Sequence, residues 1–417
     1  MEYTALGDTV NLASRMQELA EPGTVHLTEN TYRAVADFVE CEPLGALTVK
    51  GKSAPVMAYR ALREKTTVRT RLQAAVERGL TTFVGRQQEL SMLGGYFEQA
   101  KRGQGRVIFV SGEAGIGKSR LLLEFRHSTL DEPVVWLEGH CISYGKQIPY
   151  LPIVDVIKRN FGVEEGDNDQ RIIGRVDEGT AAWEEPARGT APYLKYLLNV
   201  DPGDAAVGVM DPAERRAGIL DGLRALLLQE SRGRPLVVVV EDLHWIDEKS
   251  EDALRALVEV VASAPILMVL NYRPGYAHSL GEGAYYSRIA LSPLPPEESA
   301  VIAELVLQVA ALPQQVRQLI TSKAEGNPFY IEEVTKSLVE SGVLRKENGS
   351  YRLERPPEQV HVPDTIQEVI LSRIDRLQRE AKEAIQLASV IGREFTVRLL
   401  QRISDVDAKL DELLSGL

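Results

Sequence analysis

Between about Phe83 and Leu291 the chain alternates short apolar runs with longer segments whose apolar residues recur at helical spacing. The four short runs cover residues 107–110, 134–137, 236–240 and 266–270. Each run is nearly continuous, which is typical of parallel strands that are covered on both faces. The pattern therefore predicts an α/β fold over residues 81–295, with a parallel sheet between layers of helices.

The first 62 residues have a different pattern and predict a separate domain. We expect a polar helix over 8–19, a turn at 21–24, a short strand and a second helix from about Glu29. Another strand is expected over 56–60. Residues 63–80 are charged and polar, and we expect them to form a linker.

Three more segments follow from the same analysis. Residues 160–211 are acidic and glycine-rich, which predicts an insertion or a helical lid within the sheet domain. Prolines at 293–296 close that domain, and the helices after them predict a smaller helical lid domain over 296–360. Within it, Asn348-Gly349 between two strand-like segments is a type I′ hairpin signal. Helices resume after Pro363.

The strongest chemical signal is a glycine-rich loop between a predicted strand and a predicted helix. Its sequence is Gly112-Glu113-Ala114-Gly115-Ile116-Gly117-Lys118-Ser119, followed by Arg120, and it fits the P-loop pattern G-x-x-x-x-G-K-[ST]. Such a loop points backbone N–H groups at phosphate oxygens, and the helix N-terminus behind it favours negative charge. Lys118 is expected to reach the β- and γ-phosphates and the Ser119 hydroxyl to ligate Mg²⁺. The sequence therefore predicts a site for a nucleoside triphosphate with Mg²⁺.

Two acids follow the third apolar run, as a second P-loop signature requires. One of Glu241 and Asp242 would hold the Mg²⁺ shell, and the other would polarise the attacking water. The register favours Glu241 for the metal and Asp242 for the water, although the two could exchange roles. The next run ends near Arg273, which we expect to sense the γ-phosphate through charge-assisted hydrogen bonds.

Composition excludes several other classes of protein. The 417 residues carry a net charge of −12, which argues against non-specific binding to nucleic acid or an anionic membrane. No apolar run approaches the roughly 18 residues of a membrane-spanning helix, and the N-terminus lacks the features of a signal peptide. Two distant cysteines without metal or redox spacing indicate reduced thiols and a cytoplasmic protein.

The order of these motifs resembles that of the AAA-type signal-transduction ATPases with numerous domains. Beyond the loop and the acids, the resemblance rests on residues 83–86, 139–141, 148–150, 242–245, 326–329, 362–367 and 388–392. Glu241 stands where many members carry Asp, and Asn271 where many carry Thr. The resemblance implies that the backbone of Val84, Gly85 and Arg86 approaches the adenine and that Pro328 packs on it.

The same resemblance implies a switch with slow ATP hydrolysis. ADP would hold a winged-helix arm over 361–417 closed, and ATP would release it for self-association. This winged-helix pattern stops where the family continues into helical repeats, so we expect an inducer or protein partner to act through repeats beyond this chain. The nearly balanced charge of the arm makes DNA binding an unfavoured expectation. A transcriptional regulator of the same switch family is the alternative function.

Residues 1–62 resemble the C-terminal half of a class III adenylate/guanylate cyclase domain, on the match over residues 4–15. The resemblance implies that Asn11 orients the ribose, that Arg15 stabilises the transition state, and that Lys50 binds the triphosphate, with Lys52 a lesser candidate. Thr4 falls at the base-selecting position and favours ATP. The two metal-binding aspartates of that family are expected upstream of this helix, so this segment alone is not expected to make cyclic AMP. We expect a piece of a longer cyclase–ATPase protein.

Overall fold

The computed structural model describes residues 16, 20, 24–28, 32, 39–47, 56–64 and 82–354, apart from residues 144, 165, 282, 348 and 349. These residues fall into two compact units, one before and one after the break between Glu64 and Thr82, and each is described by itself. Several predictions lie outside the described residues: the roles of Thr4, Asn11, Arg15 and Lys50, most of the helix over 8–19, and the winged helix over 361–417.

The first unit contains a three-stranded antiparallel sheet in the order β1-β3-β2. Its strands are β1 (Val25–Thr28), β2 (Val39–Leu47) and β3 (Val56–Glu64). The predicted strands after the first turn and over 56–60 are confirmed, whereas β2 was not predicted. Two register shifts interrupt the pairing of β2 with β3, at Glu40/Cys41 and Pro43/Gly45, so its period-2 pattern is broken. Because β3 continues to Glu64, the linker cannot begin at residue 63.

The second unit is built on a five-stranded sheet in the order β5-β6-β7-β4-β8, and every pairing in it is parallel. The strands are β4 (Arg106–Ser111), β5 (Val135–His140), β6 (Leu236–Glu241), β7 (Ile266–Tyr272) and β8 (Tyr286–Ala290). The α/β fold class is confirmed. Because all strands run the same way, their carboxyl ends lie along one edge of the sheet.

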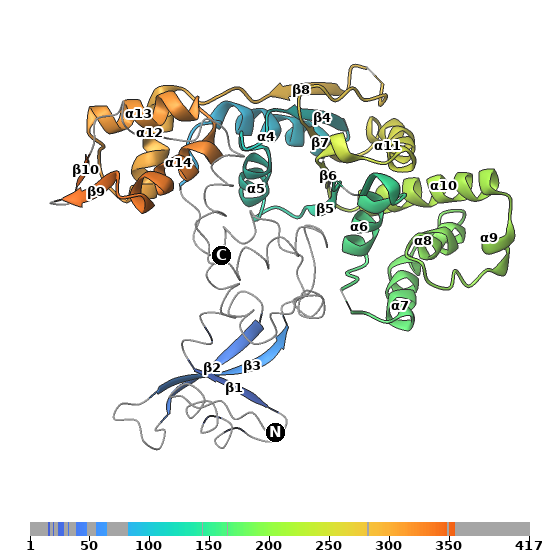
Figure 1. Ribbon diagram of the computed structural model, residues 1–417. Helices are drawn as coiled ribbons and strands as arrows, with labels where there is room; N and C mark the ends of the chain where they lie inside the picture. The colour runs from blue at the N-terminus through green and yellow to red at the C-terminus, as the bar shows by residue number, and fades with distance from the viewer. Residues whose placement is uncertain are drawn as a thin grey trace. The chain divides into compact units, whose positions relative to one another are not determined.

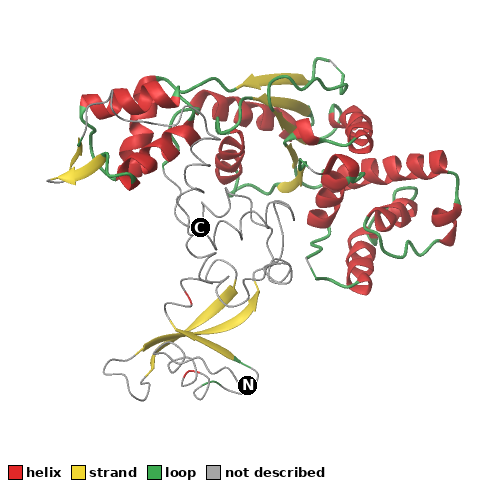
Figure 2. Ribbon diagram, in the orientation of Figure 1, coloured by secondary structure: helices red, strands yellow, loops and turns green. Residues whose placement is uncertain are grey.

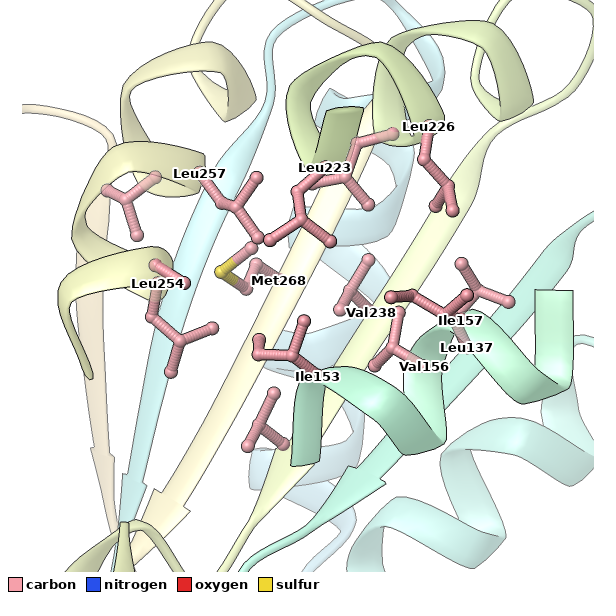
Figure 3. Close-up of a cluster of buried hydrophobic side chains, with 14 of the residues drawn as sticks. Leu137, Ile153, Val156, Ile157, Leu223, Leu226, Val238, Leu254, Leu257 and Met268 are labelled. Atoms are coloured by element: carbon pink, nitrogen blue, oxygen red, sulfur yellow. The ribbon is translucent and has the colours of Figure 1, made fainter. Parts of the chain in front are cut away.

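Both faces of this sheet are buried, which explains the continuous apolar runs. Along β4, Val107 and Phe109 enter one hydrophobic cluster, and Ile108 and Val110 enter the cluster on the opposite face. Figure 3 shows the first cluster, in which side chains of α6 (Leu151–Asn160), α10 (Pro212–Glu230) and α11 (Glu248–Val261) meet those of the strands. The opposite face is covered by α4 (Gln87–Lys101) and α5 (Lys118–Ser128).

The acidic segment 160–211 is a helical insertion whose inner side packs on the same core. It contains α7 (Asp169–Thr180), the short turn η2 (Arg188–Thr190), α8 (Ala191–Leu197) and α9 (Ala205–Val209). Trp183, Leu194 and Leu198 join the first cluster. The helical prediction for this segment is therefore confirmed, and Figure 2 shows its helices and loops.

A third hydrophobic cluster holds the helical lid together. The lid contains α12 (Pro296–Leu307), α13 (Gln314–Ala324) and α14 (Pro328–Glu340), labelled in Figure 1. The hairpin strands β9 (Leu344–Glu347) and β10 (Ser350–Leu353) pair antiparallel with Glu347 opposite Ser350, as the Asn-Gly signal predicts. The turn residues 348 and 349 are outside the described set.

Candidate nucleotide-binding site

The glycine-rich loop joins the carboxyl end of β4 to the N-terminus of α5, as predicted. Gly115 and Gly117 have φ angles of 79° and 103°, in the left-handed region that glycine adopts readily. Gly117 is the N-cap of α5, so the first free backbone N–H groups of an eleven-residue helix open beside the loop. The local geometry is that of an anion-binding loop.

Lys118, the first residue of α5, is only 7% exposed. Its Nζ donates to the carbonyl oxygens of Gly112 at 2.9 Å and Glu113 at 3.0 Å, so the ammonium group lies within the curl of the loop. Burial is the main cause that lowers the pKa of Lys118; the carboxylate of Asp242 opposes this shift, and the charge of Arg273 adds to it. A partly desolvated cation held in this way is suited to binding phosphate.

Ser119 and Glu241 meet at the carboxyl edge of the sheet. The Ser119 hydroxyl donates a short hydrogen bond to Oε2 of Glu241. Asn271, fully buried on β7, donates from Nδ2 to the same carboxylate oxygen at 3.0 Å. The oxygen atoms of Ser119 and Glu241 are the hard ligands that Mg²⁺ prefers, so these residues fit the predicted metal side of the site.

Asp242 follows Glu241 in the chain and has different partners. It adopts the left-handed conformation, with φ 58° and ψ 43°, and its backbone N–H donates to Oδ1 of Asn271 at 2.9 Å. Its carboxylate lies 3.9 Å from Nδ1 of His244, in the short turn η3 (Leu243–Trp245), and is partly exposed. The two acids therefore have different partners: Glu241 contacts Ser119 and Asn271, whereas the Asp242 carboxylate lies near His244 and acts on the charge of Lys118.

Arg273 follows β7 and is exposed. Its charge contributes to lowering the pKa of both Lys118 and His244, which places it in the same electrostatic neighbourhood. Its side chain forms no ion pair or hydrogen bond with the residues that the structure describes. The γ-phosphate-sensing role of Arg273 stays a prediction.

His140 lies beside the acids at the end of β5 but was not among the predicted site residues. Its Nε2 is 3.8 Å from Oε1 of Glu241, and its Nδ1 is 3.8 Å from Oδ2 of Asp155. Burial alone would lower the pKa of His140, but the hydrogen bond with Asp155 and the charge of Glu241 outweigh it, so the pKa is raised. The signal that could have identified it is its register, since His140 pairs with Glu241.

The segment Val84-Gly85-Arg86 contacts the beginning of the lid. Gly85 is buried, and a Cβ there would lie 2.4 Å from Oε2 of Glu298 and 3.0 Å from Leu294. The Arg86 guanidinium donates to the carbonyl oxygen of Ser292. The three residues therefore lie where the sheet domain meets the lid, a position compatible with the predicted adenine contact, which stays a prediction.

The lid also reaches the loop itself through Gly326-Asn327-Pro328-Phe329. Asn327 Nδ2 donates to the Ala114 carbonyl oxygen at 2.8 Å, and the Phe329 N–H donates to that of Gly115 at 3.3 Å. Pro328, expected to pack on adenine, is the first residue of α14 and half-buried. The resemblance predicted a role for Pro328 but none for Asn327, which the structure shows in contact with the loop.

In the part of the chain that the structure describes, the side chains do not form a multi-ligand metal site. Across the described ranges, no group of three or more His, Cys, Asp or Glu side chains could hold a metal ion. A nucleotide-bound Mg²⁺ needs only one or two protein oxygens, because phosphates and waters complete its shell. Ser119 and Glu241 fit that requirement.

Family models match most of the chain in three pieces. The model "AAA ATPase domain" matches residues 82–269, and the model "Adenylate and Guanylate cyclase catalytic domain" matches residues 1–62. A domain of unknown function, DUF8739, matches residues 295–352, which covers the lid. The chain thus combines an AAA ATPase domain with part of a cyclase catalytic domain.

Curated relatives are longer than this chain. An uncharacterized protein of Rhizobium meliloti is 29% identical over 405 residues, which cover 95% of this chain and 38% of that protein. Adenylate cyclase type 10 of Oryctolagus cuniculus is 20% identical, over 96% of this chain and 28% of its own length. The chain therefore spans between about a quarter and two fifths of these relatives.

Among solved structures, a signal transduction ATPase with numerous domains from Pyrococcus horikoshii, described as having a tetratricopeptide repeat sensor, is 12% identical with a TM-score of 0.43. That match covers 80% of this chain and 39% of the other. A RuvB variant of Thermotoga maritima is 14% identical with a TM-score of 0.35, over 80% of this chain and 86% of the other. Within the described residues, no helix has both the length and the apolar character needed to cross a membrane.

Proposed function

We propose that this chain, which carries an AAA ATPase domain after part of a purine-nucleotide cyclase domain, is the ATP-binding switch module of a larger signalling protein. The observation that carries the proposal is the meeting of Lys118, Ser119 and Glu241 around one phosphate-binding loop. These residues would hold the phosphates and Mg²⁺ of ATP, with Mg²⁺ neutralising charge on the phosphate oxygens.

The roles proposed for Glu241, Asp242 and Arg273 follow from the contacts and positions of their side chains. Glu241 contacts Ser119 and would keep the metal-side hydroxyl oriented, while Asp242, which has no hydrogen bond to that hydroxyl, would orient the attacking water. Arg273 would contact the γ-phosphate and lose that contact after hydrolysis, which provides the differential interaction that a two-state switch requires. Slow turnover and ATP-dependent self-association belong to this proposal by resemblance to the signal-transduction ATPases.

The test is ATP binding by Lys118→Ala. Removing a buried ammonium group from the loop is expected to weaken ATP binding by at least about a hundredfold, since a charge-assisted contact contributes roughly 1.5–3 kcal/mol and this one serves two phosphates. Titration calorimetry with Mg²⁺-ATP measures the loss. Lys249→Ala, which removes an exposed lysine of α11, is the charge-matched control and should bind as the unmodified protein does. Undiminished ATP affinity in Lys118→Ala would refute the proposal.

The cyclase segment extends the proposal to the whole protein. The curated relatives from three mammals are adenylate cyclases, and this chain resembles the cyclase family at Asn11, Arg15 and Lys50. We infer that the complete protein forms a cyclic purine nucleotide, with ATP the favoured substrate, and that the ATPase domain regulates this output.

A further inference from the structure

The lid and the phosphate-binding loop are joined by two hydrogen bonds that neither domain would make alone. Asn327 Nδ2 donates to the Ala114 carbonyl oxygen at 2.8 Å, and the Phe329 N–H donates to the Gly115 carbonyl oxygen at 3.3 Å. The approach is close: a Cβ on Gly115 would lie 2.8 Å from Asn327 Oδ1 and 2.9 Å from Phe329 Cβ. Only glycine leaves room for the lid at this position.

With these two bonds, four successive carbonyl groups of the loop accept hydrogen bonds. Those of Gly112 and Glu113 accept from Lys118, and those of Ala114 and Gly115 accept from the lid. A carbonyl oxygen that faced the phosphate would repel it. Because C=O and N–H of one planar trans peptide point in opposite directions, a carbonyl held toward the lid turns the next N–H away from the lid.

We propose that Asn327 is a positioning residue for the phosphate-binding loop: its amide holds the loop in the conformation that presents N–H groups to phosphate. Phosphate binding and lid closure are thereby coupled, independently of any contact between the lid and the base. This inference rests on the proposed function, because it concerns how that same site binds ATP.

The packing of Gly326 against Leu294, at the entry to the lid, supports this role. The N–H of Leu294 donates to the carbonyl oxygen of Gly326 at 2.8 Å, and a Cβ on Gly326 would lie 2.3 Å from the Leu294 carbonyl oxygen. The residue immediately before Asn327 is therefore fixed against the segment that enters the lid. This packing fixes the backbone next to Asn327 and so favours one position of its amide against the loop.

Asn327 also caps α14, and a test must separate this role from its hydrogen bond to the loop. Its Oδ1 accepts from the Tyr330 N–H at 3.3 Å and caps α14. Serine is also a good N-cap residue, but its shorter side chain has no amide group to reach Ala114. Asn327→Ser therefore keeps the cap and the neutral charge while it removes the bond to the loop.

The experiment measures binding of inorganic tripolyphosphate with Mg²⁺, a probe that has no base for the lid to contact. Asn327→Ser is expected to weaken tripolyphosphate binding about three- to tenfold, the effect of losing one hydrogen bond. The matched control is Asn168→Ser, because Asn168 caps α7 through the Arg171 N–H at 3.0 Å and forms no hydrogen bond with the loop. The control should bind tripolyphosphate as the unmodified protein does.

Equal affinity of Asn327→Ser and the unmodified protein would overturn the inference, and so would an equal loss in Asn168→Ser. Asn327→Asp, which also keeps the cap, is the second variant if the first fails to fold, and its loss must persist at high salt, where charge repulsion is screened. If the unmodified protein binds neither ATP nor tripolyphosphate, the proposed function itself fails, a result distinct from an unaffected Asn327→Ser.

Discussion

At the scale of single residues, Asn271 connects the two acids of the site. Its amide donates to the Glu241 carboxylate and accepts from the N–H of Asp242, whose left-handed backbone it holds. Asn271→Ala should therefore slow ATP hydrolysis by about ten- to a hundredfold, because a hydrogen bond to a charged group contributes roughly 1.5–3 kcal/mol. ATP affinity should change less than about threefold, since Lys118 and the loop are untouched. Single-turnover hydrolysis and ATP titration measure the two quantities.

The control for this prediction is Asn271→Thr. A threonine hydroxyl can donate to Glu241 and accept from Asp242, but its reach is shorter, so hydrolysis should fall between the values for the unmodified protein and Asn271→Ala. An Asn271→Ala protein that hydrolyses ATP at the normal rate would show that the bridge has no part in the reaction.

The sequence predicted those site residues whose neighbours along the chain already define them. The loop and the acid pair follow directly from strand–loop–helix spacing, and the structure brings Ser119 and Glu241 into contact. His140 and Asn327 were missed as site residues because their partners, Glu241 and Ala114, lie far away in sequence. In the sequence, His140 is explained as the last residue of a strand and Asn327 as a helix N-cap. Only the folded structure shows that each also contacts the site.

At the scale of elements, three consecutive leucines on α10 differ in burial according to whether they lie on the side of the helix that packs on the core. Leu226 and Leu227 are each 1% exposed, whereas Leu228 is 38% exposed. Leu226→Ala should lower the free energy of unfolding by about 2–5 kcal/mol, because it leaves a cavity against the sheet. Leu228→Ala, the same chemical change on the same helix, should lower it by less than about 1 kcal/mol. Urea unfolding curves measure both values, and similar losses in the two variants would contradict the packing described here.

Elements with a strong apolar pattern were the predictable ones. The runs at 236–240 and 266–270 gave β6 and β7 nearly to the residue, because both faces of these strands are buried. The strand β8 was missed because it lies at the edge of the sheet and its five residues include the exposed Arg288 and Ala290. The expected start of the second strand at residue 134 was one residue early, and its polar end, Glu138 to His140, was not included.

At the scale of the whole molecule, the proposed cyclase activity can be separated from the ATPase. In the full-length protein, Asn11→Ala and Arg15→Ala should each reduce cyclic AMP formation by about a hundredfold or more, the usual effect of removing a group that stabilises a transition state. ATP hydrolysis by the AAA domain should stay within about twofold. Mass spectrometry of cyclic AMP and a phosphate-release assay measure the two activities.

Lys118→Ala in the same protein provides the reciprocal comparison. It should remove ATP hydrolysis and change cyclic AMP formation without abolishing it, because the cyclase residues remain. Full cyclic AMP formation after both Asn11→Ala and Arg15→Ala would refute the assignment of those residues.

The two hydrogen bonds between lid and loop also affect the rates at which nucleotide enters and leaves the site. Together they contribute about 1–3 kcal/mol, so losing both would raise the population of open lids by about five- to 150-fold. Because the lid touches the loop beside the phosphate cradle, an open lid would ease both the entry of ATP and the exit of ADP. If phosphate binding favours the closed lid, release would slow more than entry. A bound nucleotide would then be released slowly. The domain would behave as a timer whose period is set by how seldom the lid opens.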